Sequence, residues 1–122
     1  MDALFNLTTG FGNTANGFSA LYNNTSGSSN TATGSVALYN NTANDNTANG
    51  FQALYNNTSG NANTATGSLA LYNNTASDNT ATGSQALSNN TTGFGNTANG
   101  YFALQSNTTG AGNLNRGKRE SS

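Results

Sequence analysis

The sequence predicts an all-β fold, a repeat β-solenoid or β-roll built from units of about 16–17 residues. Three observations lead to this prediction. A short motif recurs along nearly the whole chain, Gly and Asn interrupt every possible helical turn, and the composition is poor in residues that fill a two-layer core. Only 6% of the 122 residues are charged, whereas an ordinary globular domain has about 25%.

The low apolar content leaves two structural classes, a disordered chain or a repeat protein with one thin continuous core. Disordered chains usually carry a high net charge, whereas the net charge of this chain is −1. Asn and Thr make up about a third of the residues, and Pro is absent. A nearly neutral, Asn-rich chain tends to pair with itself, so we expect an ordered repeat structure.

The triplet Asn-Thr-Ala marks each repeat, and the longer and shorter spacings between its copies alternate along the chain. The whole unit reads Asn-Thr-Ala-x-Gly-x-x-Ala-Leu-x-x-Asn-Thr, followed by a connector that holds all the length variation. Residues 27–50 closely match residues 60–83. A duplicated block of two units explains this match, and a coil of about 33 residues with two similar sides is the alternative.

The repeats predict one solenoid over residues 1–113, with about seven units of which the first is truncated, and a polar charged tail over residues 114–122. The tail holds every cation of the chain, namely Arg116, Lys118 and Arg119. We interpret it as a solvated terminus that blocks end-to-end stacking. The chain starts in the middle of a unit and has no signal peptide pattern, so we expect a segment of a longer array.

Two short segments of each unit are long enough to form one side of a small coil. In the first complete unit they are residues 14–17 and residues 19–22, which we predict to be strands. The Gly and Asn positions between them supply corners, because these residues tolerate the positive φ angles of tight turns.

Stacking in register would place identical side chains over one another. Asn side chains could then form a ladder in which each amide donates to the next. The predicted ladder residues are Asn13, Asn30, Asn46, Asn63, Asn79 and Asn96. The predicted core residues are Leu21, Leu38, Leu54, Leu71, Leu87 and Leu104.

Two further positions vary in a correlated way after the repeat Gly. Where the first is Ser, the second is usually Val or Leu, and where the first is Phe, the second is polar. This exchange indicates one apolar contact per coil, either at a subunit interface or within the packing of the chain. A rank of Tyr22, Tyr39, Tyr55 and Tyr72 is either a second contact stripe or a cover over a thin core.

Units such as residues 30–42 resemble the Asn-Thr-Ala-x-Gly-x-x-Ala-Leu repeats of phage-tail-fibre-like and trimeric autotransporter adhesin-like proteins. They are similar, less closely, to the Asn-Ser-Val-Ala-x-Gly repeats of the YadA-type adhesin head. The resemblance covers about nine-tenths of the chain and implies a left-handed β-roll assembled as a homotrimer. The YadA-type repeats are shorter and have Val and Ile where this chain has Ala, Asn or Thr.

Enzyme chemistry has little to work with, because the chain has no His and no Cys and its acidic residues form no local pair. We therefore expect no enzyme, no catalytic residue, no metal site and no cofactor. Asp45 and Asp78 occupy equivalent connector positions two units apart. They would stack around a hard cation such as calcium if one coil took two units, but solvated turn residues are the favoured interpretation.

The predicted function is a non-enzymatic structural or adhesive segment of an extracellular, cell-surface or virion fibre. Expected partners are further copies of the chain, in a homotrimer or a filament, and a host-surface or glycan ligand. No nucleic acid is expected, nor membrane insertion, since no apolar run approaches about 20 residues. One alternative is an ice-binding β-solenoid, although Thr mostly stands beside Asn rather than beside a second Thr. The other is a self-assembling, amyloid-like filament.

Overall fold

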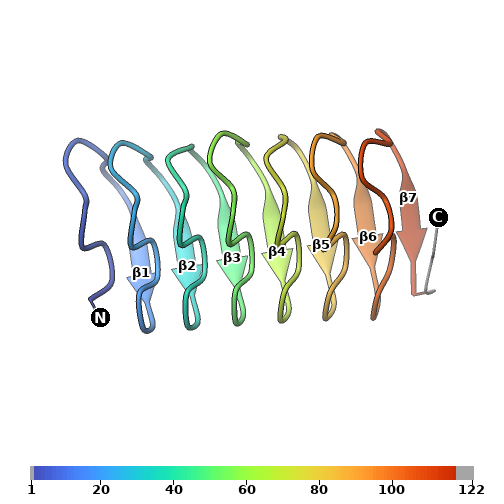
Figure 1. Ribbon diagram of the computed structural model, residues 1–122, viewed down its shortest axis with the longest axis horizontal. Helices are drawn as coiled ribbons and strands as arrows, with labels where there is room; N and C mark the ends of the chain where they lie inside the picture. The colour runs from blue at the N-terminus through green and yellow to red at the C-terminus, as the bar shows by residue number, and fades with distance from the viewer. Residues whose placement is uncertain (1, 118–122) are drawn as a thin grey trace.

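The computed structural model describes residues 2–117 as a stack of coils (Figure 1). Seven strands of three residues each lie side by side in one parallel sheet, in chain order. They are β1 (Thr14–Asn16), β2 (Thr31–Thr33), β3 (Thr47–Asn49), β4 (Thr64–Thr66), β5 (Thr80–Thr82), β6 (Thr97–Asn99) and β7 (Leu114–Arg116). The all-β solenoid predicted from the sequence is confirmed. The described residues contain no helical segment that could span a membrane.

Each coil is one repeat unit. Thr14 pairs with Thr31 and Ala15 with Ala32, and every later strand pairs with the next in the same register. The alternative in which one coil takes two units is therefore wrong. Asp45 and Asp78 lie two coils apart, and the coil between them carries Ala62 at the same position, so the stacked pair of carboxylates that a shared cation required is not formed.

The sheet extends beyond the expected end of the repeat. β7 pairs with β6 although its outward residues differ from those of earlier strands. Leu114 stands where earlier strands have Thr, and Arg116 stands where they have Thr or Asn. Backbone pairing thus continues through residues that the sequence pattern assigns to the tail. Lys118 and Arg119 lie outside the described residues.

The segment over residues 19–22, predicted to be a strand, is a turn. Ser19 and Leu21 have φ angles of 54° and 52°, in the left-handed region that costs an L-residue about 1–2 kcal/mol. Backbone hydrogen bonds offset this cost, because the Leu21 N–H donates to the Ala37 carbonyl of the next coil over 3.0 Å. Each coil has only one strand, so the chain has to turn back within residues 19–22 to begin the next coil. An extended segment cannot make this turn.

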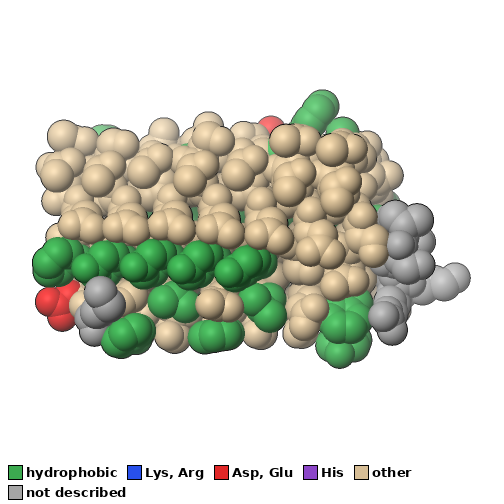
Figure 2. Space-filling model, in the orientation of Figure 1, with side chains coloured by type: hydrophobic (Ala, Val, Ile, Leu, Met, Phe, Trp, Pro, Cys, Tyr) green, Lys and Arg blue, Asp and Glu red, His purple; other side chains and the backbone are tan. Residues whose placement is uncertain are grey.

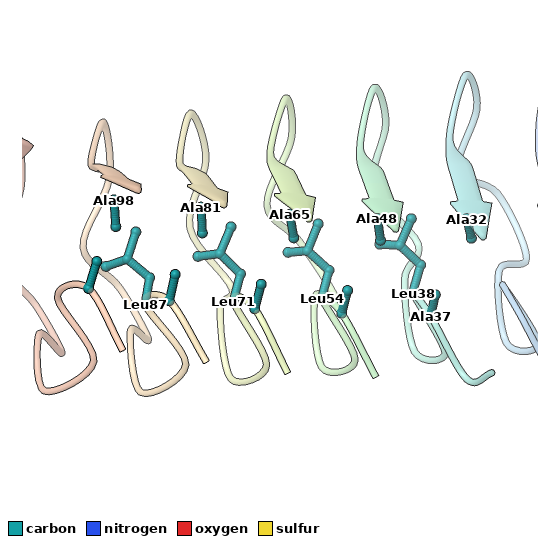
Figure 3. Close-up of a cluster of buried hydrophobic side chains, with 14 of the residues drawn as sticks. Ala32, Ala37, Leu38, Ala48, Leu54, Ala65, Leu71, Ala81, Leu87 and Ala98 are labelled. Carbon is teal, nitrogen blue, oxygen red and sulfur yellow. The ribbon is translucent and has the colours of Figure 1, made fainter. Parts of the chain in front are cut away.

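The core is a narrow column of Ala and Leu side chains. In strands β2 to β6 the middle Ala points inward, while both its neighbours point outward. Facing each Ala are the Leu of the turn and the Ala before it (Figure 3). The leucines that we predict as core are buried in the structure: Leu21, Leu38, Leu54, Leu71 and Leu87 are fully buried, and Leu104 is 7% exposed.

A column of Gly follows the strands, and its members approach one another through their backbones. Gly50 has a φ of 141°, and a Cβ atom placed on it would lie 2.7 Å from the carbonyl carbon and oxygen of Gly67. The same close approach recurs along Gly17, Gly34, Gly50, Gly67 and Gly83. These glycines allow successive coils to stack at the spacing of a parallel sheet, about 4.8 Å.

We predict that Gly50→Ala lowers the free energy of unfolding by about 2–5 kcal/mol, since the new methyl group meets backbone that cannot move without breaking the stack. Gly95→Ala is the matched control. Gly95 also has a positive φ, 65°, but a Cβ atom there would meet nothing nearer than the Gly112 nitrogen at 4.0 Å. Ala62 already occupies the same position of its own coil at a φ of 57°. Urea denaturation followed by circular dichroism measures both, and equal losses would contradict the stacking argument.

Candidate functional site

The Asn at the start of each strand ties its coil to the next through the backbone. The Asn30 side-chain Oδ1 accepts a hydrogen bond of 2.9 Å from the backbone N–H of Asn46, and Asn46 Oδ1 accepts from Asn63 in the same way. The pattern runs without a break through Asn13, Asn30, Asn46, Asn63, Asn79, Asn96 and Asn113. The predicted asparagine ladder is present, but its regular rungs join an amide oxygen to a backbone N–H rather than an amide to an amide.

The NH₂ groups of this ladder donate to the connector instead. Asn30 Nδ2 donates to the Ala43 carbonyl over 2.8 Å, and Asn46 Nδ2 donates to the Gly60 carbonyl over 2.9 Å. Each of these carbonyls belongs to the connector that leads into the next coil. The ladder therefore fixes both the strand start and the variable connector, which explains how connectors of different length leave the sheet in register.

A second Asn rank forms an amide-to-amide ladder. Asn57 Nδ2 donates to Asn41 Oδ1 over 2.8 Å and to the Gly60 carbonyl over 2.7 Å. In the sequence, the Asn residues of this second rank serve only as markers of the repeat. Their constant separation from the first Asn rank, as between Asn30 and Asn41, is the signal that they form a second column. The rank consists of Asn24, Asn41, Asn57, Asn74, Asn90 and Asn107, all of them buried.

A third, half-buried rank adds bonds of the same kind, from Asn23 Nδ2 to Asn40 Oδ1 over 2.9 Å. Hydroxyls of the connector side also link coils: the Thr42 Oγ1 donates to the Thr58 carbonyl over 2.7 Å. The Thr75 Oγ1 donates to the Thr91 carbonyl over 2.9 Å. Side-chain hydrogen bonds between coils are thus present on several sides of the solenoid.

An aromatic ladder runs along one side of the first five coils (Figure 2). Its members are Phe5, Tyr22, Tyr39, Tyr55 and Tyr72, with ring centroids 5.2–5.3 Å apart and nearly parallel planes. Inside the ladder each ring is stacked on the next, and the Tyr side chains are half-buried. Desolvation within the stack raises the pKa of Tyr55, and the neighbouring Tyr72 and Tyr39 phenols add to the rise.

More exposed aromatic side chains stand in the same turn of the coil as the ladder residues, a few positions earlier. Phe18 and Phe51 are 56% and 51% exposed, and Tyr101 is 64% exposed. They occupy the position after the repeat Gly, and Figure 2 shows further hydrophobic side chains beside the aromatic ladder. We call the aromatic ladder together with Phe18, Val36, Phe51, Leu69 and Tyr101 the apolar side.

The outward side chains of the sheet form a second surface, which we call the threonine face. Its first rank is Thr14, Thr31, Thr47, Thr64, Thr80 and Thr97, and its second rank is Asn16, Thr33, Asn49, Thr66, Thr82 and Asn99. All of these side chains are exposed. The described part of the chain contains neither a pocket nor a group of three His, Cys, Asp or Glu residues that could hold a metal ion. The candidate sites are therefore these two extended surfaces.

We predict that Asn46→Ala lowers the free energy of unfolding by about 2–4 kcal/mol, since it leaves the buried N–H of Asn63 without its acceptor and removes the bond to the Gly60 carbonyl. Asn49→Ala is the control, because Asn49 is exposed on the threonine face, and it should change stability by about 0.5 kcal/mol or less. Chemical denaturation of both variants tests this. A loss for Asn46→Ala no larger than for its control would show that the ladder contributes nothing.

No protein-family model matches the chain, and comparisons with curated proteins and with solved structures found no significant match.

Proposed function

We propose that the chain is a non-enzymatic structural and adhesive repeat segment of an extracellular, cell-surface or virion fibre. The observation that carries this proposal is the continuity of the asparagine ladders, in which each coil supplies the partners that the next coil needs. A chain of this kind gains length by adding units, at about 4.8 Å per coil. A stiff rod of adjustable length is what a fibre requires.

The composition of the surface supports a structural role over a catalytic one. The buried Asn side chains are engaged in ladders, and most exposed polar side chains are neutral amides and hydroxyls arranged in long rows. The resemblance of the repeat to tail-fibre-like and trimeric adhesin-like proteins points the same way. The extracellular or virion location rests on that resemblance.

The apolar side is the surface where copies of the chain would meet in a homotrimer. Exposed aromatic side chains such as Phe18 and Phe51 have an apolar area that would be removed from water at such an interface. Their rings also suit contact with the apolar faces of sugars, and this supports a glycan ligand at positions that the interface leaves free.

Electron microscopy of the source cells or virions with a gold-labelled antibody against the chain tests the location. We expect gold particles along surface fibres. Labelling confined to the cell interior would overturn the fibre proposal, and a control antibody against a cytoplasmic protein sets the background.

The mass of the purified chain in solution tests self-association. We expect three copies per particle by light scattering. Phe51→Ser removes an exposed ring from the proposed interface and should reduce the assembly to single chains. The coil itself should tolerate Ser, because Ser68 already stands at this position one coil later. Phe94→Ser is the control: Phe94 is 62% exposed but lies on a connector, so its removal should leave the trimer intact. A wild-type chain that is monomeric at high concentration would contradict the trimer.

A further inference from the structure

We propose that the threonine face binds ice. The threonine face is a different surface from the apolar side, so ice binding there does not depend on the fibre function. Residues alternate between inward and outward orientations along the strands. Because the middle Ala of β2, β4 and β5 is buried, the residues on both sides of it project outward. The exposed Thr pairs are Thr31 with Thr33, Thr64 with Thr66, and Thr80 with Thr82.

A comparison of adjacent residues in the sequence does not predict a paired Thr face, because Thr mostly stands beside Asn. The relevant neighbour in a strand is two residues away, across the Ala, and not the adjacent residue. The strands β2, β4 and β5 carry Thr at both outward positions, and β1, β3 and β6 carry Thr and Asn. The first rank is Thr in all of these strands.

The face is a regular grid. The strands pair in the same register from β1 to β7, and the difference in coil length lies in the connectors. Neighbouring Thr side chains are therefore about 4.8 Å apart across the strands and about 6.6 Å apart along each strand. Water molecules repeat at similar intervals on the prism surfaces of hexagonal ice, so the grid can hold water in an ice-like arrangement. Figure 1 shows the strands running in a common direction along the whole stack.

The hydroxyls of this grid are available to water. On the connector side, Thr8, Thr42, Thr75 and Thr91 use their hydroxyls to bond carbonyls of the next coil. Among residues 2–117, the Thr hydroxyls of the threonine face make no such bond. Each of these side chains offers one hydroxyl and one methyl group, and its branched Cβ restricts rotation about χ1. The array is therefore both free to bind water and stiff enough to order it.

The chemistry of the face favours ice over other extended ligands. Its Thr and Asn side chains carry no charge, so neither nucleic acid nor an ionic surface is attracted to it. It contains no aromatic side chain, and aromatic rings are what bind flat polysaccharide chains through their sugar faces. What remains is a stiff, neutral array of hydroxyls and methyls, which fits a solid made of water.

The experiment measures thermal hysteresis, the gap between melting and freezing temperature of a seeded ice crystal, for the purified chain and its variants. We expect the wild-type chain to open a gap and to shape the crystal into facets. Thr64→Lys, at the centre of the grid, should lose most of the gap. Thr58→Lys introduces the same charge on an exposed connector residue and should keep the gap. Circular dichroism and melting temperature confirm that both variants are folded.

A gain-of-function variant guards against substitutions that simply unfold the chain. Asn49→Thr would complete an unbroken second rank from Thr33 to Thr82 and should widen the gap. Absence of hysteresis in the wild-type chain, equal loss in Thr64→Lys and Thr58→Lys, or no gain from Asn49→Thr would each overturn the proposal. Binding of the wild-type chain to microcrystalline cellulose or chitin, abolished by Thr64→Lys, would overturn it in favour of a carbohydrate ligand.

Discussion

The solenoid depends on hydrogen bonds from buried Asn side chains to the backbone of adjacent coils. Each coil has only a short strand, and although turn residues such as Leu54 bond the backbone of the next coil, the Asn63 N–H and the Gly60 carbonyl have no backbone partner in the described part of the chain. Buried backbone groups in turns still need partners. Asn46 supplies them on two sides, because its oxygen accepts from the N–H of Asn63 and its NH₂ group donates to the Gly60 carbonyl. The apolar core of Ala and Leu is narrow. A narrow core is sufficient because the buried Asn amides beside it have hydrogen-bond partners.

This arrangement also explains how the chain tolerates left-handed residues in every coil. Leu38 and Leu54 have φ angles of 51° and 52°, a conformation that L-residues rarely adopt. The strain is local, whereas the bonds that offset it run between coils, such as the one from the Leu38 N–H to the Ala53 carbonyl. An isolated coil would keep the strain and lose these bonds. Stability is therefore a property of the stack, as nearest-neighbour coupling requires in repeat proteins.

The period, the strand at Asn-Thr-Ala and the asparagine ladder could be predicted from the sequence, because stacking in register turns identical residues into neighbours. The direction of the Asn bonds could not, since it depends on where the connector brings the carbonyl of Gly60. The turn at residues 19–22 could not be predicted either, because Ala-Leu-Tyr carries no sequence signal for positive φ. By contrast, the second outward rank at Thr33 and Thr66 follows from strand alternation alone, once Ala32 and Ala65 are assigned to the core.

A stacked repeat also determines what kind of ligand its surfaces can bind. Each position of the unit projects into a row, so any side chain placed there is repeated at the spacing of the coils. A single exposed hydroxyl or ring edge holds a ligand weakly, and a small molecule meets only one or two of them. An extended partner meets the whole row, and its contacts add because they form on one rigid body. The threonine face and the apolar side are rows of this kind. The solenoid therefore suits extended partners that match its period, and we propose a different partner for each face: ordered water for the threonine face, and further copies of the chain or a glycan for the apolar side.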